Sequence, residues 1–315
     1  MTALPQHPSE GTERERASLV INRVARALAA AGVEAPRAEA EQLAAYVLDV
    51  PRGRLALADG FTPAQRDRLD ALVGRRVTRE PLQHLLGSAG FRHLELAVGP
   101  GVFVPRPETE LLAGWGIERA REHAAPLVVD LCSGSGAIAL AVAQEVPAAR
   151  VVAVERSPAA LAWLRRNAAD RAAAGDRPVE VVAADVTGPE LLAGLAGRVD
   201  VLLCNPPYVP RSVAVPPEVA GHDPDEAVFG GADGLDVIRP VVRRAAELLR
   251  PGGAIGIEHD DTHAAAVPAL LRGDGRYDRV EEHRDLAGRP RWASASRRAD
   301  GTHAETARAW QTDSS

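Results

Sequence analysis

The segment most suggestive of chemistry is Asn205-Pro206-Pro207-Tyr208, which directly follows a short apolar run. Both prolines lack a backbone N–H and fix φ at about −65°, so neither a helix nor a central strand continues through them. The chain therefore leaves its strand in a rigid turn. That turn presents the side chain of Asn205 and the carbonyls of Asn205 and Pro206 as hydrogen-bond acceptors. Because a lone Pro-Pro pair more often only ends a strand, the role of this corner depends on its surroundings.

Acidic and glycine residues follow three other apolar runs. Asp130 ends the first, and Gly134 and Gly136 lie in the next turn, where glycine lets a ligand approach the backbone closely. The spacing is not G-x-G-x-x-G, and Asp130 suits an ammonium group better than a pyrophosphate. Glu155 can accept hydrogen bonds from ribose hydroxyls, and Asp185 follows the third run, where an adenine would lie. Singly, each is more often a solvated acid; together and in this order they predict a pocket for S-adenosylmethionine.

A parallel α/β sheet would bring these residues together. Short buried runs alternate with helical segments, and strands are expected at 127–131, 150–155, 179–184, 200–204 and 253–258. Helices then cover both faces, and the site lies at the carboxyl ends of the strands. Residues 277–297 predict two more strands joined by a turn, as an antiparallel edge. Pro240 should start or kink the helix expected at 235–249.

Before the sheet, residues 17–87 have the apolar spacing of a small helical bundle. Thr62, Pro63 and Gln65 form a helix start with a capping box. The residues expected on buried helix faces are Leu19, Val20, Val24, Leu28, Leu43, Tyr46, Val47, Leu69, Leu72 and Val73. Next, Leu94, Leu96 and Val98 alternate, and a turn at 99–101 leads into 102–104, which predicts a β-hairpin between two domains.

The domain boundaries follow from these patterns. We expect disordered ends at 1–15 and 299–315, a helical domain at 16–88, a hairpin linker at 89–104 and a catalytic domain at 105–298. Trp310 in the C-terminal tail has no explanation in these terms.

Composition excludes several classes of function. With 315 residues and 46% hydrophobic content the chain can bury a full core. No apolar run approaches a membrane span and the N-terminus is charged, so we expect a cytoplasmic protein without membrane contact. A net charge of −6 disfavours stable binding of nucleic acid. The two cysteines form no CxxC pattern, and His259 and His263 lack a third ligand, so no metal is predicted.

With Asn-Pro-Pro-Tyr at the fourth strand end, the chain resembles the amino-group methyltransferases, which act on planar nitrogens of glutamine, adenine or guanine. Four further blocks narrow the resemblance: PLQHLLG (81–87), VFVPRPETE (102–110), FGGADGLDVIRP (229–240) and RDLAGRPRW (284–292). They resemble, in family order, those of the bacterial release-factor glutamine methyltransferases over residues 17–297. The resemblance implies a Rossmann-like class I methyltransferase sheet, mostly parallel, preceded by a helical domain.

The resemblance also implies roles for individual residues. The family's cofactor loop falls on Cys132, Ser133, Gly134, Ser135 and Gly136, its ribose acid on Glu155 and its adenine-side residue on Val186. Many family members have Gly-Thr where this chain has Cys132-Ser133. Residues 205–208 would hold the glutamine. Arg106 and Glu108 orient substrate or cofactor, or else cap the first helix of the catalytic domain.

The acceptor corner suits transfer of a methyl group to an amide. A carboxamide nitrogen is a poor nucleophile because its lone pair is delocalised into the carbonyl. Asn205 Oδ1 and the Pro206 carbonyl can each accept one N–H, which orients the nitrogen and stabilises its developing positive charge. Tyr208 would pack on the planar amide. No strong base is needed, since the proton becomes acidic only when the methyl group arrives.

Three other functions stay open. The same pocket would serve another protein glutamine, such as one on a ribosomal protein. A nucleic-acid amino methyltransferase should carry a basic recognition region, which the acidic balance disfavours. A non-enzymatic adenosylmethionine-binding module would have a defect in the acceptor corner, and none is visible. The favoured partner is a peptide-chain release factor, recognised by the helical domain of a monomeric enzyme.

Overall fold

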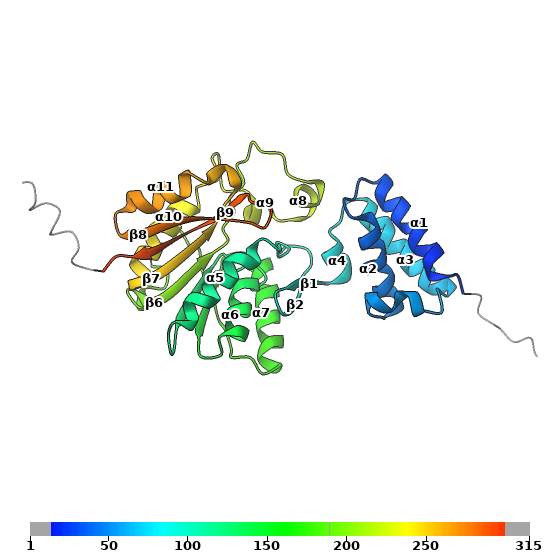
Figure 1. Cartoon of the computed structure of the whole chain (residues 1–315), viewed down its shortest axis with the longest axis horizontal. Coiled ribbons are helices and arrows are strands. Elements are labelled where there is room, and N and C mark those ends of the chain that lie inside the picture. Colours follow the sequence, from blue (N-terminus) through cyan, green and yellow to red (C-terminus); the bar gives the residue numbers. More distant parts are fainter. Residues whose placement is uncertain (1–13, 189, 300–315) are drawn as a thin grey trace, which may run out of the picture. The chain divides into compact units, whose positions relative to one another are not determined.

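The computed structural model describes residues 14–188 and 190–299, which divide into two compact units between Gly87 and Ser88. The predictions for residues 1–13 and 300–315, including Trp310, lie outside the described residues. The N-terminal unit is helical, as predicted (Figure 1). Its helices are α1 (Ala17–Ala30), α2 (Pro36–Leu48), a 3-10 helix (Arg52–Leu57), α3 (Pro63–Val77) and α4 (Leu82–Leu86).

Local sequence signals in the helical unit are largely confirmed. Gln65 N donates to the Thr62 hydroxyl and Thr62 N to the Gln65 side chain, which closes the capping box of α3. Two residues expected to be buried are not: Leu19 is 57% exposed and Tyr46 is 40% exposed. Leu19 lies off the face on which α1 buries its other apolar residues, and the Tyr46 ring instead packs under a surface arginine.

The helical unit also begins earlier than expected. Glu15, assigned to the disordered N-terminal segment, exchanges two backbone hydrogen bonds with Phe61. The added bridge closes the bundle over the fully buried Phe61 ring.

The C-terminal unit contains the predicted sheet. Its seven strands lie in the order β5-β4-β3-β6-β7-β9-β8, and the first five are parallel. The strands are β3 (Leu127–Leu131), β4 (Arg150–Glu155), β5 (Glu180–Ala183), β6 (Val199–Cys204), β7 (Leu249–Glu258), β8 (Tyr277–Arg284) and β9 (Pro290–Arg297). Strand β9 is antiparallel to both of its neighbours, so the predicted antiparallel edge is confirmed.

Helices cover both faces of the sheet (Figure 1). On one face lie α5 (Thr109–Arg121), α6 (Ala137–Glu145) and α7 (Pro158–Ala173), and on the other α10 (Ile238–Leu248) and α11 (Ala266–Asp274). Pro240 is the third residue of α10, in the first turn, where its missing N–H would have no partner in the helix, as predicted for a helix start. Two short helices, α8 (Pro217–His222) and α9 (Asp225–Val228), follow β6. Each face buries its own apolar cluster.

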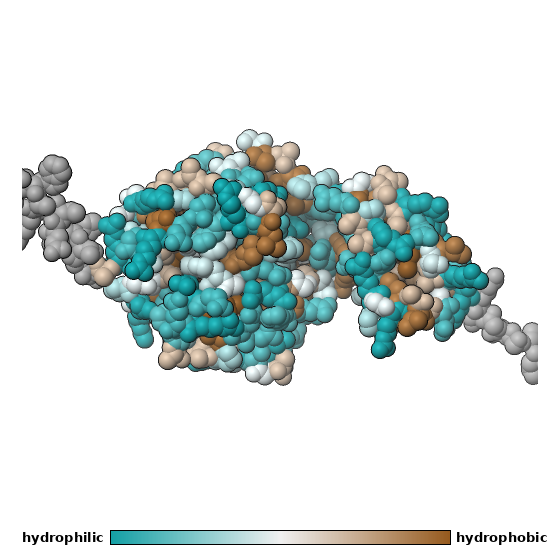
Figure 2. Space-filling model, in the orientation of Figure 1, coloured by the Kyte–Doolittle hydropathy of each residue, from teal (hydrophilic) through white to brown (hydrophobic). Residues whose placement is uncertain are grey.

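The surface is consistent with this layering. Hydrophilic residues cover most of the face of each unit that Figure 2 shows. No helix among residues 14–188 and 190–299 is long and apolar enough to cross a membrane.

The predicted hairpin exists, but its pairing differs. Strand β1 (Ser88–Phe91) pairs with β2 (Leu94–Ala97), and the turn lies at Arg92, whose φ is +52°. The stretch 102–104 forms no strand. Gly99 instead packs against the Trp163 ring of α7, where a Cβ would lie 2.6 Å from ring carbon Cζ2. The chain does turn at 100–101, where Gly101 has a φ of +86°, but no strand follows that could pair with β2.

One buried side chain joins this hairpin to the rest of the unit. Asn167 of α7 is 2% exposed, and its Oδ1 accepts from Ala97 N at 2.8 Å. Its Nδ2 donates to the carbonyls of Ala97 at 3.0 Å and Ser135 at 2.9 Å. Ser135 belongs to the loop after β3. Asn167 thus ties the hairpin and that loop to one helix.

Replacing Asn167 with Ala should lower the free energy of unfolding by about 3 kcal/mol, because three backbone groups lose their partner in a buried place. Urea denaturation of the full chain, followed by tryptophan fluorescence, measures the change. Asn22→Ala, which alters an exposed asparagine of α1, is the control and should cost less than about 0.5 kcal/mol. A loss at Asn167 no larger than at Asn22 would refute the bridging role.

Candidate active site

The loop after β3 and the corner after β6 lie where the strand order reverses. Strand β3 lies between β4 and β6, and the chain runs from β4 to the far edge before returning to β6. The crevice above the carboxyl ends of β3 and β6 is therefore the topological switch point, where open α/β sheets bind ligands. Leu131 and Cys204 are register partners at this edge. The loop after β3 and the Asn-Pro-Pro-Tyr corner thus leave the sheet side by side.

The loop after β3 alternates between ordinary and left-handed backbone. Cys132, Gly134 and Gly136 have φ values of +59°, +56° and +90°. At Gly136 a Cβ would lie 2.6 Å from Leu164 Cδ1, so only glycine lets α6 begin this close to α7. At Gly134 no atom lies within 4 Å of the place a Cβ would take. The loop therefore has open space against its backbone at Gly134.

Asp130, next to this loop, bonds to the start of the helix that follows it. Its side chain is almost fully buried, and Oδ2 accepts from Ala139 N in the first turn of α6 at 3.1 Å. Burial raises the pKa of Asp130 to about 7, against the effect of the Ser133 and Ala139 hydrogen bonds. Oδ1 has no hydrogen-bond partner. Asp130 thus holds the start of α6 and keeps one buried acceptor unused.

Glu155, at the end of β4, shapes the loop through its oxygens. Oε2 accepts from Gly134 N at 2.9 Å, and Oε1 accepts from Arg156 N and Ser157 N, both at 2.8 Å. A carboxylate oxygen can accept about two hydrogen bonds. Oε2 therefore retains one acceptor position for a ligand hydroxyl.

Asp185 and Val186 follow β5, as expected, but differ in burial. The Asp185 carboxylate accepts from Thr187 N and Oγ1 in its own loop and from the guanidinium of Arg156, which follows β4. Val186 is 5% exposed and packs with the apolar cluster on the α10 face.

Asn205 is held in one orientation after β6. Its Nδ2 donates to the hydroxyl of Thr109, the first residue of α5, at 3.1 Å. Pro206 and Pro207 beside it are buried. Because the amide nitrogen is engaged, Oδ1 is the group that Asn205 offers as an acceptor.

Tyr208 is held by a carboxylate that the sequence analysis did not include in the site. Its hydroxyl donates to Oε1 of Glu258, the last residue of β7, at 3.1 Å. Burial, and then the Glu258 charge, raise the pKa of Tyr208. Burial likewise raises the pKa of Glu258 to about 7, although the Thr109 and Tyr208 hydroxyls and Arg291 favour its ionised form.

The segment 228–234 packs its backbone against residues 207–209 at this corner. Val209 N donates to the Val228 carbonyl, and Gly230 N donates to the Val209 carbonyl, both at 3.0 Å. A Cβ at Gly230 would lie 2.5 Å from the Pro207 carbonyl oxygen, and one at Gly234 would lie 2.2 Å from that of Tyr208. These glycines let the backbone of one segment press directly on the other.

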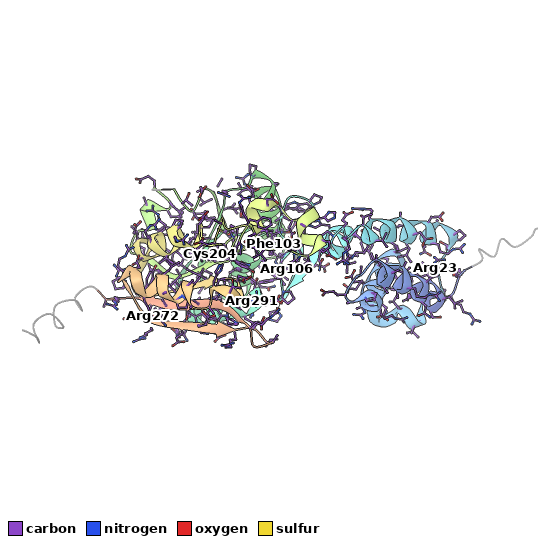
Figure 3. The ribbon with its side chains drawn as sticks, turned by 90° about the horizontal axis from the view of Figure 1, so that it is seen from above. Arg23, Phe103, Arg106, Cys204, Arg272 and Arg291 are labelled. Atoms are coloured by element: carbon purple, nitrogen blue, oxygen red, sulfur yellow. The ribbon has the colours of Figure 1, made fainter. Side chains whose placement is uncertain are left out.

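Arg106 does not cap α5. Its Nη2 donates to Asp223 Oδ2 at 2.8 Å, and its guanidinium lies 4.9 Å from the centroid of the Phe103 ring (Figure 3). Burial raises the pKa of Asp223, and the Arg106 charge opposes that rise. Glu108 stands at the N-cap position of α5 without a side-chain capping bond.

Three contributors were missed from sequence: Thr109, Glu258 and Arg291. Arg291, on β9, lies close enough to Tyr208 and Glu258 to shift their pKa values, and its Nη2 donates to Asp285 at 3.3 Å. Two signals were present in the sequence. Thr109 and Arg291 belong to blocks 102–110 and 284–292, and Glu258 ends a buried strand, as Asp130 and Glu155 do.

The two histidines after β7 have structural partners. His259 Nε2 bonds to Glu282 Oε2 at 3.0 Å, and His263 Nε2 to the Asp233 carbonyl at 2.9 Å. Over the described part of the chain, no group of three or more His, Cys, Asp or Glu side chains could hold a metal ion.

Comparison with known proteins gives matches over both units. Residues 20–87 match the PrmC N-terminal domain, and residues 110–219 match the methyltransferase small domain. A release factor glutamine methyltransferase of Mycolicibacterium smegmatis is 52% identical over 270 residues, which cover 86% of this chain and 94% of that protein.

Two further matches give context. A 4-amino-L-phenylalanine/4-methylamino-L-phenylalanine methyltransferase of Streptomyces pristinaespiralis is 43% identical over 79% of this chain and 85% of its own. The solved structure of a protein-(glutamine-N5) methyltransferase of Alicyclobacillus acidocaldarius aligns with a TM-score of 0.40 at 24% identity, over 64% of this chain and 99% of that one.

Proposed function

The chain belongs to the release factor glutamine methyltransferase family, and from that premise we propose that it methylates the glutamine of the Gly-Gly-Gln motif in peptide-chain release factors. S-adenosylmethionine is the proposed methyl donor, and the side-chain amide nitrogen is the acceptor. The observation that carries the proposal is the Asn205 amide, whose nitrogen is engaged by Thr109 so that its oxygen is left for a substrate N–H.

The residues at the switch point fit S-adenosylmethionine. Open space beside Gly134 admits a ligand against the loop backbone, and Asp130 Oδ1 is a buried acceptor without a partner. Glu155 Oε2 has room for a ribose hydroxyl. We assign the adenine side to Asp185 and Val186 and the loop contacts to residues 132–136. When bound, the cofactor supplies a sulfonium methyl group that a weak nucleophile can accept.

The acceptor corner orients the substrate amide and stabilises the charge that develops on it. Asn205 Oδ1 and the Pro206 carbonyl accept the two amide N–H bonds, which aims the nitrogen lone pair along the path of transfer. The same acceptors stabilise positive charge as the new N–C bond forms. Tyr208, fixed by Glu258, packs on the plane of the amide. The methylated nitrogen then releases one proton, so no base must act beforehand.

Arg106 and the helical unit are assigned to substrate recognition. The Arg106 side chain is about one-third exposed while it is paired with Asp223. Its other N–H groups can therefore donate to a carbonyl of the substrate. The helical unit contains none of the groups proposed for methyl transfer, which suits a role in binding the release factor. We propose a cytoplasmic monomer without stable nucleic-acid binding, since release factors act in translation in that compartment.

A methylation assay with competing substrates tests the function. The full chain and methyl-labelled S-adenosylmethionine are incubated separately with a release factor, ribosomes, DNA and 4-amino-L-phenylalanine. The last is included because it is named for a relative of 43% identity. Label should appear on the release factor at the Gly-Gly-Gln glutamine and vanish when that glutamine is replaced by alanine. Label on another substrate, with none on the release factor, would overturn the proposal.

Glu155→Ala should weaken S-adenosylmethionine binding by about 1–3 kcal/mol, because ligand hydroxyls lose an acceptor and the backbone N–H groups of Gly134, Arg156 and Ser157 lose theirs. Calorimetry measures the dissociation constant. Glu155→Gln keeps the shape and should lose less, and Glu180→Ala, on the exposed end of β5, should bind as the parent does. Binding of NAD in place of S-adenosylmethionine would contradict the cofactor assignment.

Asn205→Ala should reduce kcat about 10²- to 10³-fold, as removal of one preorganised group at a charge-developing centre does. Asn205→Asp keeps an acceptor oxygen and adds a negative charge near the sulfonium, so it should rank between the parent and Ala. Single-turnover transfer to a release factor at saturating cofactor isolates the chemical step. An Ala variant within about threefold of the parent would remove the assigned role of this corner.

A further inference from the structure

We propose that Cys132 and Cys204 are an oxidation site, at which a reversible disulfide forms and disables the cofactor loop. The chain has two cysteines, about seventy residues apart in sequence, and both are free thiols in the structure. The fold places them at the ends of adjacent strands, since Cys204 ends β6 and Cys132 directly follows β3. The cross-link does not depend on the function proposed above, but its effect on cofactor binding does.

The strand register brings the two backbones within reach of a disulfide. Leu131 and Cys204 are register partners in the parallel pair of β3 and β6. Adjacent strands lie about 4.8 Å apart, and Cys132 is one residue, about 3.8 Å, beyond Leu131. Because these two displacements are roughly perpendicular, the Cα atoms of Cys132 and Cys204 lie about 6 Å apart. Disulfides join Cα atoms that are about 4.4–6.8 Å apart.

The backbone conformation at Cys132 places both side chains on one face of the sheet. In a regular strand, Cys132 would point to the face opposite that of Leu131. Its φ is +59° instead, and its side chain packs against the apolar cluster on the α10 face. Leu131 and Cys204 belong to that same cluster. Burial, and then the neighbouring Cys132 thiol, raise the pKa of the Cys204 thiol, which agrees with this placement.

The difference in burial sets the order of the reaction with a peroxide. Cys132 is partly exposed and Cys204 is fully buried, so hydrogen peroxide reaches Cys132 first. The Cys132 sulfur attacks one peroxide oxygen, the O–O bond breaks, and a sulfenic acid and one water result. The Cys204 sulfur then attacks the sulfenic sulfur, the S–O bond breaks, and the hydroxyl leaves with the Cys204 proton as a second water. Two thiols are oxidised, one peroxide is reduced, and a dithiol reverses the step.

The cross-link acts against the bond that holds the cofactor loop. A disulfide keeps its sulfurs about 2 Å apart, closer than any unbonded contact, so closing it draws Cys132 toward β6. Two residues further on, Gly134 N donates to Glu155 Oε2 at the end of β4, at 2.9 Å. Strand β4 lies on the side of β3 opposite β6, so the two interactions pull the loop in opposite directions. Oxidation therefore distorts the loop and weakens the binding of S-adenosylmethionine.

Peptide mapping tests the cross-link. The reduced full chain is treated with hydrogen peroxide, alkylated under denaturing conditions and digested. A peptide pair joined through Cys132 and Cys204 should appear, and dithiothreitol should remove it. In Cys204→Ala the sulfenic acid at Cys132 has no thiol to react with and should be trapped by dimedone, whereas in Cys132→Ala the shielded Cys204 should stay open to alkylation. A sulfenic acid in the parent that never links to Cys204, or a link only between two chains, overturns the inference.

Calorimetry with S-adenosylmethionine tests the effect of the cross-link. The oxidised parent should bind about tenfold more weakly than the reduced parent, the equivalent of one lost hydrogen bond, and dithiothreitol should restore the affinity. Cys132→Ala is compared only with itself, and peroxide should leave its affinity unchanged. Equal affinity of the fully cross-linked and the reduced parent overturns the inference. If a variant does not fold, the mapping and calorimetry of the parent decide. A reduced parent that binds no S-adenosylmethionine contradicts the proposed cofactor instead.

Discussion

The parallel hydrogen bonding between β3 and β6 is the constraint on which the rest of the structure depends. Four register pairs, ending at Leu131 and Cys204, fix where both strands stop. Because the strands are adjacent in space but separated by about seventy residues of chain, the loop after β3 and the corner after β6 can each be specialised independently. A slip of one residue in this register would turn every side chain of a strand to the opposite face. Cofactor loop and acceptor corner would then no longer meet.

Three buried acids lie at the carboxyl ends of the parallel strands, and each has different hydrogen-bond partners. Asp130 bonds the start of a helix, Glu155 accepts three backbone N–H groups, and Glu258 accepts a side-chain hydroxyl. Burial raises the pKa of both Asp130 and Glu258 to about 7. The strand ends therefore include two groups that can change charge near neutral pH. The acids of this edge are thus not interchangeable.

The sequence was most informative where structure is local. Strands β3 and β4 were predicted to the residue because each is a contiguous apolar run, and the capping box at Thr62 depends only on neighbours three apart. The hairpin pairing was wrong because β2 pairs with β1 rather than with 102–104, a choice of partner that the local turn signal at 99–101 does not specify. Thr109, Glu258 and Arg291 were missed for a related reason. They act through contacts between segments distant in sequence, which residue types and spacing do not specify.

The left-handed backbone at Cys132 has a consequence for how the cofactor loop is organised before any ligand arrives. A non-glycine residue in that region carries a conformational cost of about 1–2 kcal/mol, and here the thiol packs against the apolar cluster on the α10 face. A side chain at this position also reduces the number of backbone conformations of the unfolded chain, compared with glycine. Fixing residue 132 on folding therefore costs less conformational entropy than it would with glycine, which offsets part of the cost of the left-handed backbone.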